Sequence, residues 1–111
     1  MSAPRALIHV QHLLGVGHLR RALALGRALA DARAEVTVAS GGMQVPNLPA
    51  DGLKLVQLPA ARAADATFKQ LLDETGKPVD DSWRAKRKAA LLDLFAATKP
   101  DLLVIELYPF G

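Results

Sequence analysis

The residues best suited to chemistry lie in a short stretch between an apolar run and a helical pattern. This stretch contains Gly15 and Gly17, followed at once by His18. Glycines let the backbone turn tightly and approach a ligand, and the free N–H groups at a helix start favour negative charge. The same potential favours the neutral imidazole that a general base needs. We predict an anionic ligand at this loop with His18 as base, the alternative being a plain turn with a capping histidine.

Known nucleotide-binding patterns match this loop only in part. The dinucleotide fingerprint needs a third glycine, where this chain has Arg20, and an acidic residue roughly 20 positions on. The second apolar run ends instead in Ser40, Gly41 and Gly42. No Gly-Lys-Ser/Thr of a P-loop occurs. NAD and FAD are therefore disfavoured, and the remaining pattern is Gly-x-Gly-His-x-x-Arg.

Glu106 is the second candidate catalytic residue. It is the first charged residue after the apolar run 102–105, so it should end a buried strand. If that strand lies beside the first one, Glu106 and His18 face the crevice where parallel α/β sheets bind ligands. Glu106 would then orient the imidazole of His18, and a solvated carboxylate at a strand end is the open alternative.

Basic residues offer further anion contacts. Arg20 and Arg21 follow the glycine loop, and arginine near a helix start holds phosphate or carboxylate in a bidentate manner. At least one of the two is expected to be ordinary helix surface. A second basic cluster runs from Arg84 to Lys88. It could meet an anionic membrane, although a solvated helix face is the preferred interpretation.

Hydrophobic patterning predicts the elements that must position these residues. Strands are expected at residues 5–10, 35–40, 53–58 and 102–106, and helices at about 18–32 and 83–98. The first helix should bury its apolar face with Gly26 close to the sheet, because a mid-helix glycine costs about 1 kcal/mol against alanine. Caps for the second helix are expected among residues 80–82, with a stop at Pro100. Its apolar positions include Trp83, Ala90, Leu91, Leu94 and Phe95.

The element order predicts an α/β domain over residues 1–111 with a Rossmann-like parallel sheet in the order 3-2-1-4. Residues 59–66 are expected to be irregular. Residues 68–79 should form a small hairpin around a glycine–proline turn. The last strand should be followed by a crossover helix, so we expect a truncated chain, the first half of a larger fold.

Composition limits the classes of partner and compartment. The net charge is +3 with a pI of about 9.6, but the basic residues are scattered and aromatics are few, which disfavours nucleic acid. Cysteine is absent, which fits a reducing compartment, and no apolar stretch approaches the roughly 20 residues of a spanning helix. His9 and His12 should lie on opposite faces of an extended chain, so no metal site is expected. We expect a cytoplasmic protein, with peripheral contact at the inner face of the membrane as an option.

The stretch from Val10 to Arg21, followed by residues 35–42, resembles the N-terminal domain of a GT-B glycosyltransferase. The similarity is to the branch with the peptidoglycan N-acetylglucosaminyl transferase and its predicted bacterial relatives. It extends over the whole chain, including residues 62–65, 79–81 and 105–111. The resemblance implies two Rossmann-like domains across a cleft, the N-terminal one binding mainly the acceptor and a C-terminal one binding the nucleotide-sugar donor. Nothing in this sequence matches the donor-binding half.

Carried onto this chain, the resemblance implies a set of site residues. His18 is the candidate base for the acceptor hydroxyl, beside the donor phosphates. Substrate-binding residues are expected at Gly15, Val16, Gly17, Leu19, Arg20 and Arg21 along the loop, and at Gly41, Gly42 and Met43 on the acceptor side.

The expected function is therefore the acceptor-binding part of an inverting, metal-independent glycosyltransferase that transfers a hexosyl group to a hydroxyl. No cofactor is implied, because the nucleotide-diphosphate sugar is a co-substrate, and the chain alone should be inactive. Its expected partners are that nucleotide sugar, a hydroxyl acceptor and its own C-terminal domain. Two alternatives stay open. The first is a nucleotide-sugar hydrolase, because the hydrolases of the pseudaminic-acid pathway share a similar loop, and His18 would then activate water. The second is a non-catalytic ligand-binding fragment.

Overall fold

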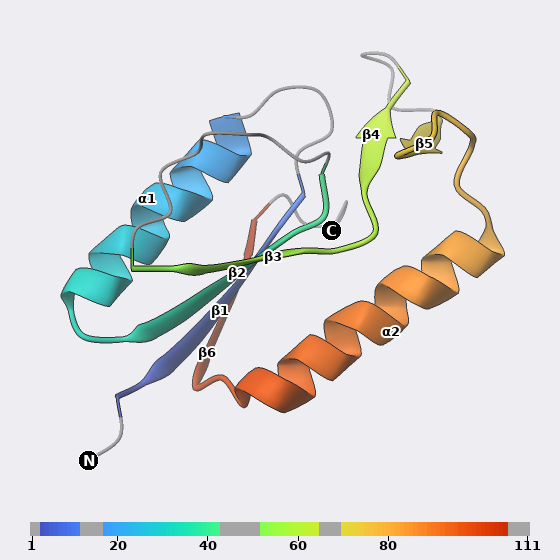
Figure 1. Cartoon of the computed structure of the whole chain (residues 1–111). Coiled ribbons are helices and arrows are strands. Elements are labelled where there is room, and N and C mark those ends of the chain that lie inside the picture. Colours follow the sequence, from blue (N-terminus) through green and yellow to red (C-terminus); the bar gives the residue numbers. More distant parts are fainter. Residues whose placement is uncertain (1–2, 12–16, 43–51, 65–69, 107–111) are drawn as a thin grey trace.

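The computed structural model describes residues 3–11, 17–42, 52–64 and 70–106, with residues 17, 18 and 106 described by their backbone alone. Figure 1 shows a parallel sheet with one helix on each face and a small two-stranded unit beside the second helix. The elements in chain order are β1 (Arg5–Val10), α1 (Gly17–Asp31), β2 (Glu35–Ser40), β3 (Lys54–Gln57), β4 (Ala61–Ala63), β5 (Leu71–Asp73), α2 (Asp81–Thr98) and β6 (Leu102–Glu106).

The main sheet has the strand order β3-β2-β1-β6, and all its pairs are parallel. Counted along this sheet alone, that is the predicted order 3-2-1-4, which is confirmed. The central strand β1 is flanked by β2 and β6, and Val10 at its end pairs with both Ser40 and Glu106. The carboxyl ends of three strands therefore lie level at one edge.

The α1 face of the sheet carries the larger apolar core. Alternate residues of β1 and β2 pack against Leu19, Ala22 and Leu23 of α1, as the period-2 and period-3.6 patterns predict. Gly26 lies where α1 approaches the sheet closely, because a Cβ there would be 3.2 Å from a methyl carbon of Leu53 and 3.4 Å from one of Val36 in β2. The predicted close approach of the helix is confirmed.

The α2 face has a thinner core. Leu7, Ala39 and Leu58 are buried there, and Ala90, Leu91 and Leu94 pack partly buried against them. Phe95, another of the apolar positions of α2, is 45% exposed and does not belong to this core.

Both ends of α2 follow the predicted signals. The Asp80 carboxylate accepts a hydrogen bond from the Trp83 N–H at 2.8 Å and caps the helix. At the other end, Lys99 adopts the left-handed conformation (φ 46°) and its N–H donates to the Phe95 carbonyl at 3.0 Å. The helix thus ends at Thr98, two residues before Pro100.

The prediction that residues 59–66 are irregular is wrong for residues 61–63, which form the strand β4. This strand pairs antiparallel with β5, with Ala61 opposite Asp73. A three-residue strand has too few positions to show alternation, so its pairing arises from the tertiary context. The predicted glycine–proline turn is present: the Asp73 carboxylate accepts from the Thr75 and Lys77 N–H groups, and Leu72 bridges to Pro78.

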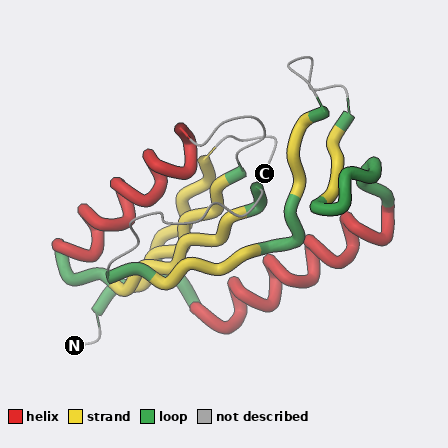
Figure 2. Tube along the Cα trace, turned by 45° about the horizontal axis from the view of Figure 1, so that its top comes forward, coloured by secondary structure: helices red, strands yellow, loops and turns green. Residues whose placement is uncertain are grey.

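Figure 2 shows the two layers from a second direction, with β4 and β5 beside the first half of α2. In the part of the chain that the structure describes, neither helix has the length and apolar character needed to cross a bilayer.

Candidate functional site

The backbone positions of several predicted site residues lie at the carboxyl edge of the main sheet. Glu106 ends β6 beside Val10 of β1, and Gly41 follows directly after β2. The helix α1 begins at Gly17, with His18 as its second residue. In parallel α/β sheets, this edge is where ligands bind. The side-chain roles of His18 and Glu106 stay predictions.

The other predicted loop residues divide into three groups. Gly15, Val16 and Met43 lie outside the described residues. Leu19 is only 2% exposed and packs in the core, so a ligand could reach its main chain alone. Arg20 and Arg21 lie exposed on α1, and their contact with an anion stays a prediction.

The two glycines after β2 are both buried. The Gly41 N–H donates to the Val10 carbonyl at 2.8 Å, and its own carbonyl accepts from the Ala61 N–H at 2.9 Å. A Cβ at position 41 would overlap the guanidinium of Arg87. The Gly42 carbonyl accepts from the Gln57 side-chain amide at 2.7 Å. Gly41 therefore makes room for a buried side chain, while contact of either glycine with an acceptor stays a prediction.

Arg87 is a buried charged residue whose place the sequence analysis did not predict. It is only 7% exposed, so its predicted place in a solvated or membrane-facing cluster is wrong. One terminal nitrogen, Nη1, donates to the carbonyls of Gly41 (3.3 Å) and Pro59 (3.4 Å). The other, Nη2, donates to His9 Nε2 (3.3 Å) and to Gln11 Oε1. Arg87 thus ties α2 to the ends of β1 and β2 and to the segment after β3.

Protonation in this cluster follows from the hydrogen bonds. Arginine has donors only, so His9 Nε2 must accept and its ring proton lies on Nδ1. Burial and the charge of Arg87 lower the pKa of His9 to about 4, and burial lowers the pKa of Arg87 to about 10. At neutral pH the cluster therefore consists of a neutral imidazole and a charged guanidinium.

The charge of Arg87 has no negative partner in the described part of the chain. Its hydrogen-bond partners are all neutral, and its Nε is buried without any partner. The guanidinium also lies over the ring of Trp83, 5.3 Å from the centroid. A buried cation held only by neutral acceptors and a ring can gain from a nearby anion.

The sequence did contain a signal for this cluster. His9 and Gln11 are polar residues two positions apart at the end of an apolar strand, so they share one face. Arg87 lies four residues after Trp83 and four before Leu91, on the apolar side of its helix. Polar residues that interrupt two apolar faces could have been predicted to meet.

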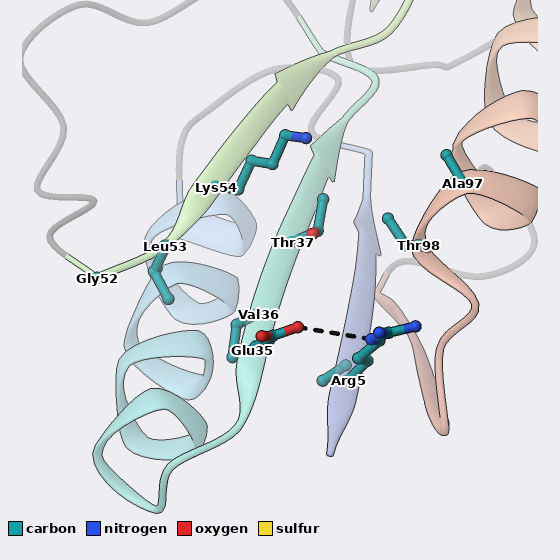
Figure 3. Close-up of a pocket in the computed structure, with 10 residues that line it drawn as sticks. Arg5, Glu35, Val36, Thr37, Gly52, Leu53, Lys54, Ala97 and Thr98 are labelled. Carbon is teal, nitrogen blue, oxygen red and sulfur yellow. Dashed lines mark ion pairs between the residues drawn. The ribbon is translucent and has the colours of Figure 1, made fainter. Parts of the chain in front are cut away.

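Two of the cavities lined by described residues bear on the site. The larger, about 630 Å³, opens at the amino-terminal edge, and Figure 3 shows Arg5 and Glu35 paired across it at 3.5 Å. It lies opposite the predicted site and contains none of its residues. The second, about 440 Å³, lies beside Arg87, between α2 and the β4–β5 unit.

Within the described ranges, no three His, Asp or Glu side chains gather in a way that could hold a metal ion. At the carboxyl edge the structure describes the backbone of His18 at the start of α1 and of Glu106 at the end of β6, and anion binding there stays a prediction. No protein-family profile, curated protein or solved structure matches the chain.

Proposed function

We propose that this chain is the acceptor-binding domain of an inverting glycosyltransferase of the GT-B type. The whole enzyme would transfer a hexosyl group from a nucleotide-diphosphate sugar to a hydroxyl. The observation that carries the proposal is the register of β1 with its neighbours: Val10 pairs with Ser40 and Glu106, and the next described element in the chain, α1, begins at Gly17. His18 and Glu106 thus belong to the same edge.

The proposed chemistry is a single displacement. The imidazole of His18 takes the proton of the acceptor hydroxyl, and the oxygen attacks the anomeric carbon. The bond from that carbon to the diphosphate breaks, and the nucleotide diphosphate leaves with the electron pair. Helix N–H groups at the start of α1 stabilise its charge, and Glu106 orients the imidazole and stabilises its protonated form.

A buried hydroxyl supports a polar ligand at this edge. Ser40 is the last residue of β2, and in the described part of the chain its Oγ is buried without a hydrogen-bond partner. Val36 and Val38 pack against α1, and Ser40 lies on the same face of β2 because alternate residues of a strand share a face. A sugar or phosphate oxygen at the glycine turn would give this hydroxyl a partner.

The donor would be held by a second domain across a cleft, as the resemblance implies, so the test uses the full-length protein. We would incubate it with UDP-N-acetylglucosamine and a lipid extract of the host as acceptor, and measure UDP release and glycosylated product. His18→Ala should lower turnover by about 10²–10⁴-fold with an unchanged circular dichroism spectrum.

The matched control is Arg27→Ala, an exposed residue of the same helix two turns further on, which should leave turnover unchanged. Turnover that survives His18→Ala would exclude His18 as the base. Release of free sugar at the full rate without acceptor would favour the hydrolase, in which His18 activates water.

A further inference from the structure

The cavity beside Arg87 has a cationic wall. It is lined by Arg84, Arg87 and Lys88, all from α2, together with the side chain of Gln11. No acidic residue is among the described residues that line it. Asp81 forms an exposed ion pair with Arg84 at 3.5 Å but does not line the cavity. Three positive charges therefore face one space without a carboxylate in its wall.

The rest of the lining is largely apolar. It consists of Ala61 from β4, Leu71 from β5, and Trp83 and Leu91 from α2. The volume of about 440 Å³ exceeds what one inorganic anion fills. It lies in the range of small-molecule sites, about 300–1,000 Å³. The cavity suits a ligand with an anionic group at one end and an apolar body at the other.

Arg87 supplies the strongest reason for an anion. Four of its N–H groups are directed to neutral acceptors, and Nε is buried without a partner in the described part of the chain. Buried charges in proteins are normally paired or neutralised. An oxyanion in the cavity would supply the missing negative charge, and exposed Arg84 and Lys88 would close around it.

The basic residues of α2 do not form a flat surface. Arg87 is buried, whereas Lys86 is exposed and does not line the cavity. An anionic bilayer is bound by basic residues that share one exposed face. The basic residues of this cluster do not share one face. The arrangement favours a small ligand that enters the cavity.

We propose that this cavity binds a small phosphate ester with an apolar or ring-shaped body, its phosphate held by Arg84 and Lys88 and attracted by the charge of Arg87. The site lies on the α2 side of the sheet and does not depend on the proposed transfer reaction.

The single tryptophan of the chain lines the cavity, so its fluorescence reports binding directly. The probe is phenyl phosphate, with phenol as its neutral counterpart. Phenyl phosphate should change the Trp83 emission in a saturable manner and raise the melting temperature of the protein. Its affinity should fall in higher salt. Phenol should produce none of these effects.

Two lysines on the same helix provide a matched pair of variants. Lys88→Gln should weaken binding about threefold to tenfold, whereas Lys86→Gln, which removes the same charge from outside the cavity, should change affinity less than twofold. Arg87→Met should abolish binding. If Arg87→Met folds poorly, the comparison of Lys88→Gln with Lys86→Gln still tests the proposal.

Three results would overturn the proposal. One is an equal response to phenol and phenyl phosphate. Another is equal weakening by Lys86→Gln and Lys88→Gln, which would indicate unspecific attraction. The third is binding to phosphatidylglycerol vesicles, and not to phosphatidylcholine vesicles, without any response to phenyl phosphate.

Discussion

Arg87 and His9 are 78 positions apart in the sequence, and their side chains meet in the interior with Nη2 and Nε2 3.3 Å apart. His9 is on the central strand and Arg87 is in the middle of α2. The contact therefore fixes the helix to the sheet at the edge where the predicted catalytic residues lie. Hydrogen bonds from the same guanidinium to Gly41 and Pro59 extend this fixation to two further segments.

Removal of the guanidinium should destabilise the fold. Arg87→Met keeps an apolar stem but leaves His9 Nε2, Gln11 Oε1 and the Gly41 carbonyl with fewer donors. Hydrogen bonds to charged groups contribute about 1.5–3 kcal/mol each, partly offset because the cost of burying an unpaired charge disappears. We expect a net loss of about 1–3 kcal/mol in the free energy of unfolding, measured by urea denaturation at pH 7. Lys86→Met, at an exposed neighbour, should change it by less than about 0.5 kcal/mol.

Gly41→Ala should be destabilising because of Arg87. The added methyl group would overlap the guanidinium, and overpacking of this kind costs about 1–3 kcal/mol. In the background of Arg87→Ala the same change should cost clearly less, because the overlapping group is gone. A double-mutant cycle by urea denaturation measures the difference. Additive effects would contradict the packing role of Gly41.

The stability should fall in mild acid because of His9. Its folded-state pKa is about 4, against about 6.5 in an unfolded chain, so the unfolded state binds more protons between these values. The contribution of neutral His9 to the free energy of unfolding is about 3 kcal/mol. It is complete above about pH 6.5 and is lost as the pH falls to about 4. Arg87 is the charged group that lowers this pKa in addition to burial.

His9→Gln offers the control for this pH dependence, because its amide oxygen can accept from Arg87 and does not titrate. Urea denaturation at several pH values between 4 and 8 should give a smaller slope for the variant than for the parent protein. Equal slopes would assign the acid sensitivity to carboxylates and not to His9.

Lys99→Gly should stabilise the protein. Lys99 ends α2 with φ 46°, a left-handed conformation that costs a residue with a Cβ roughly 1 kcal/mol and a glycine nothing. We expect a gain of about 0.5–1 kcal/mol in the free energy of unfolding. Lys99→Ala removes the same side chain without relieving the backbone, so it should give no gain. A gain from both variants would show that the lysine side chain, and not its backbone, is unfavourable.

The sequence predicted the main sheet well, because its strands are short apolar runs bounded by clear turns. The bounds of β1, β2 and β6 agree with the predicted ones residue for residue. Capping by Asp80 and the close approach at Gly26 were also predictable, since each depends on local chemistry. The strand β4 was missed because its pairing with β5 is a tertiary effect.

The buried cluster was missed for a different reason. Arg87 stands among other basic residues, and its burial depends on acceptors from three distant segments, among them His9 and the Gly41 carbonyl. Local composition favours solvent exposure for such a residue. The helical spacing from Trp83 to Leu91 was the better indicator, because it placed Arg87 on the apolar face.

The unequal cores on the two faces of the sheet set an order for partial unfolding. Among the residues that the structure describes, eight buried apolar side chains form the core that joins α1 to the sheet, whereas three form the core beneath α2. Amide protons of α2 should therefore exchange with solvent through openings that leave β1, β2 and α1 intact. Because Arg87 belongs to the part that opens, an anion bound there would slow this local opening and hold the carboxyl edge of the sheet in one conformation.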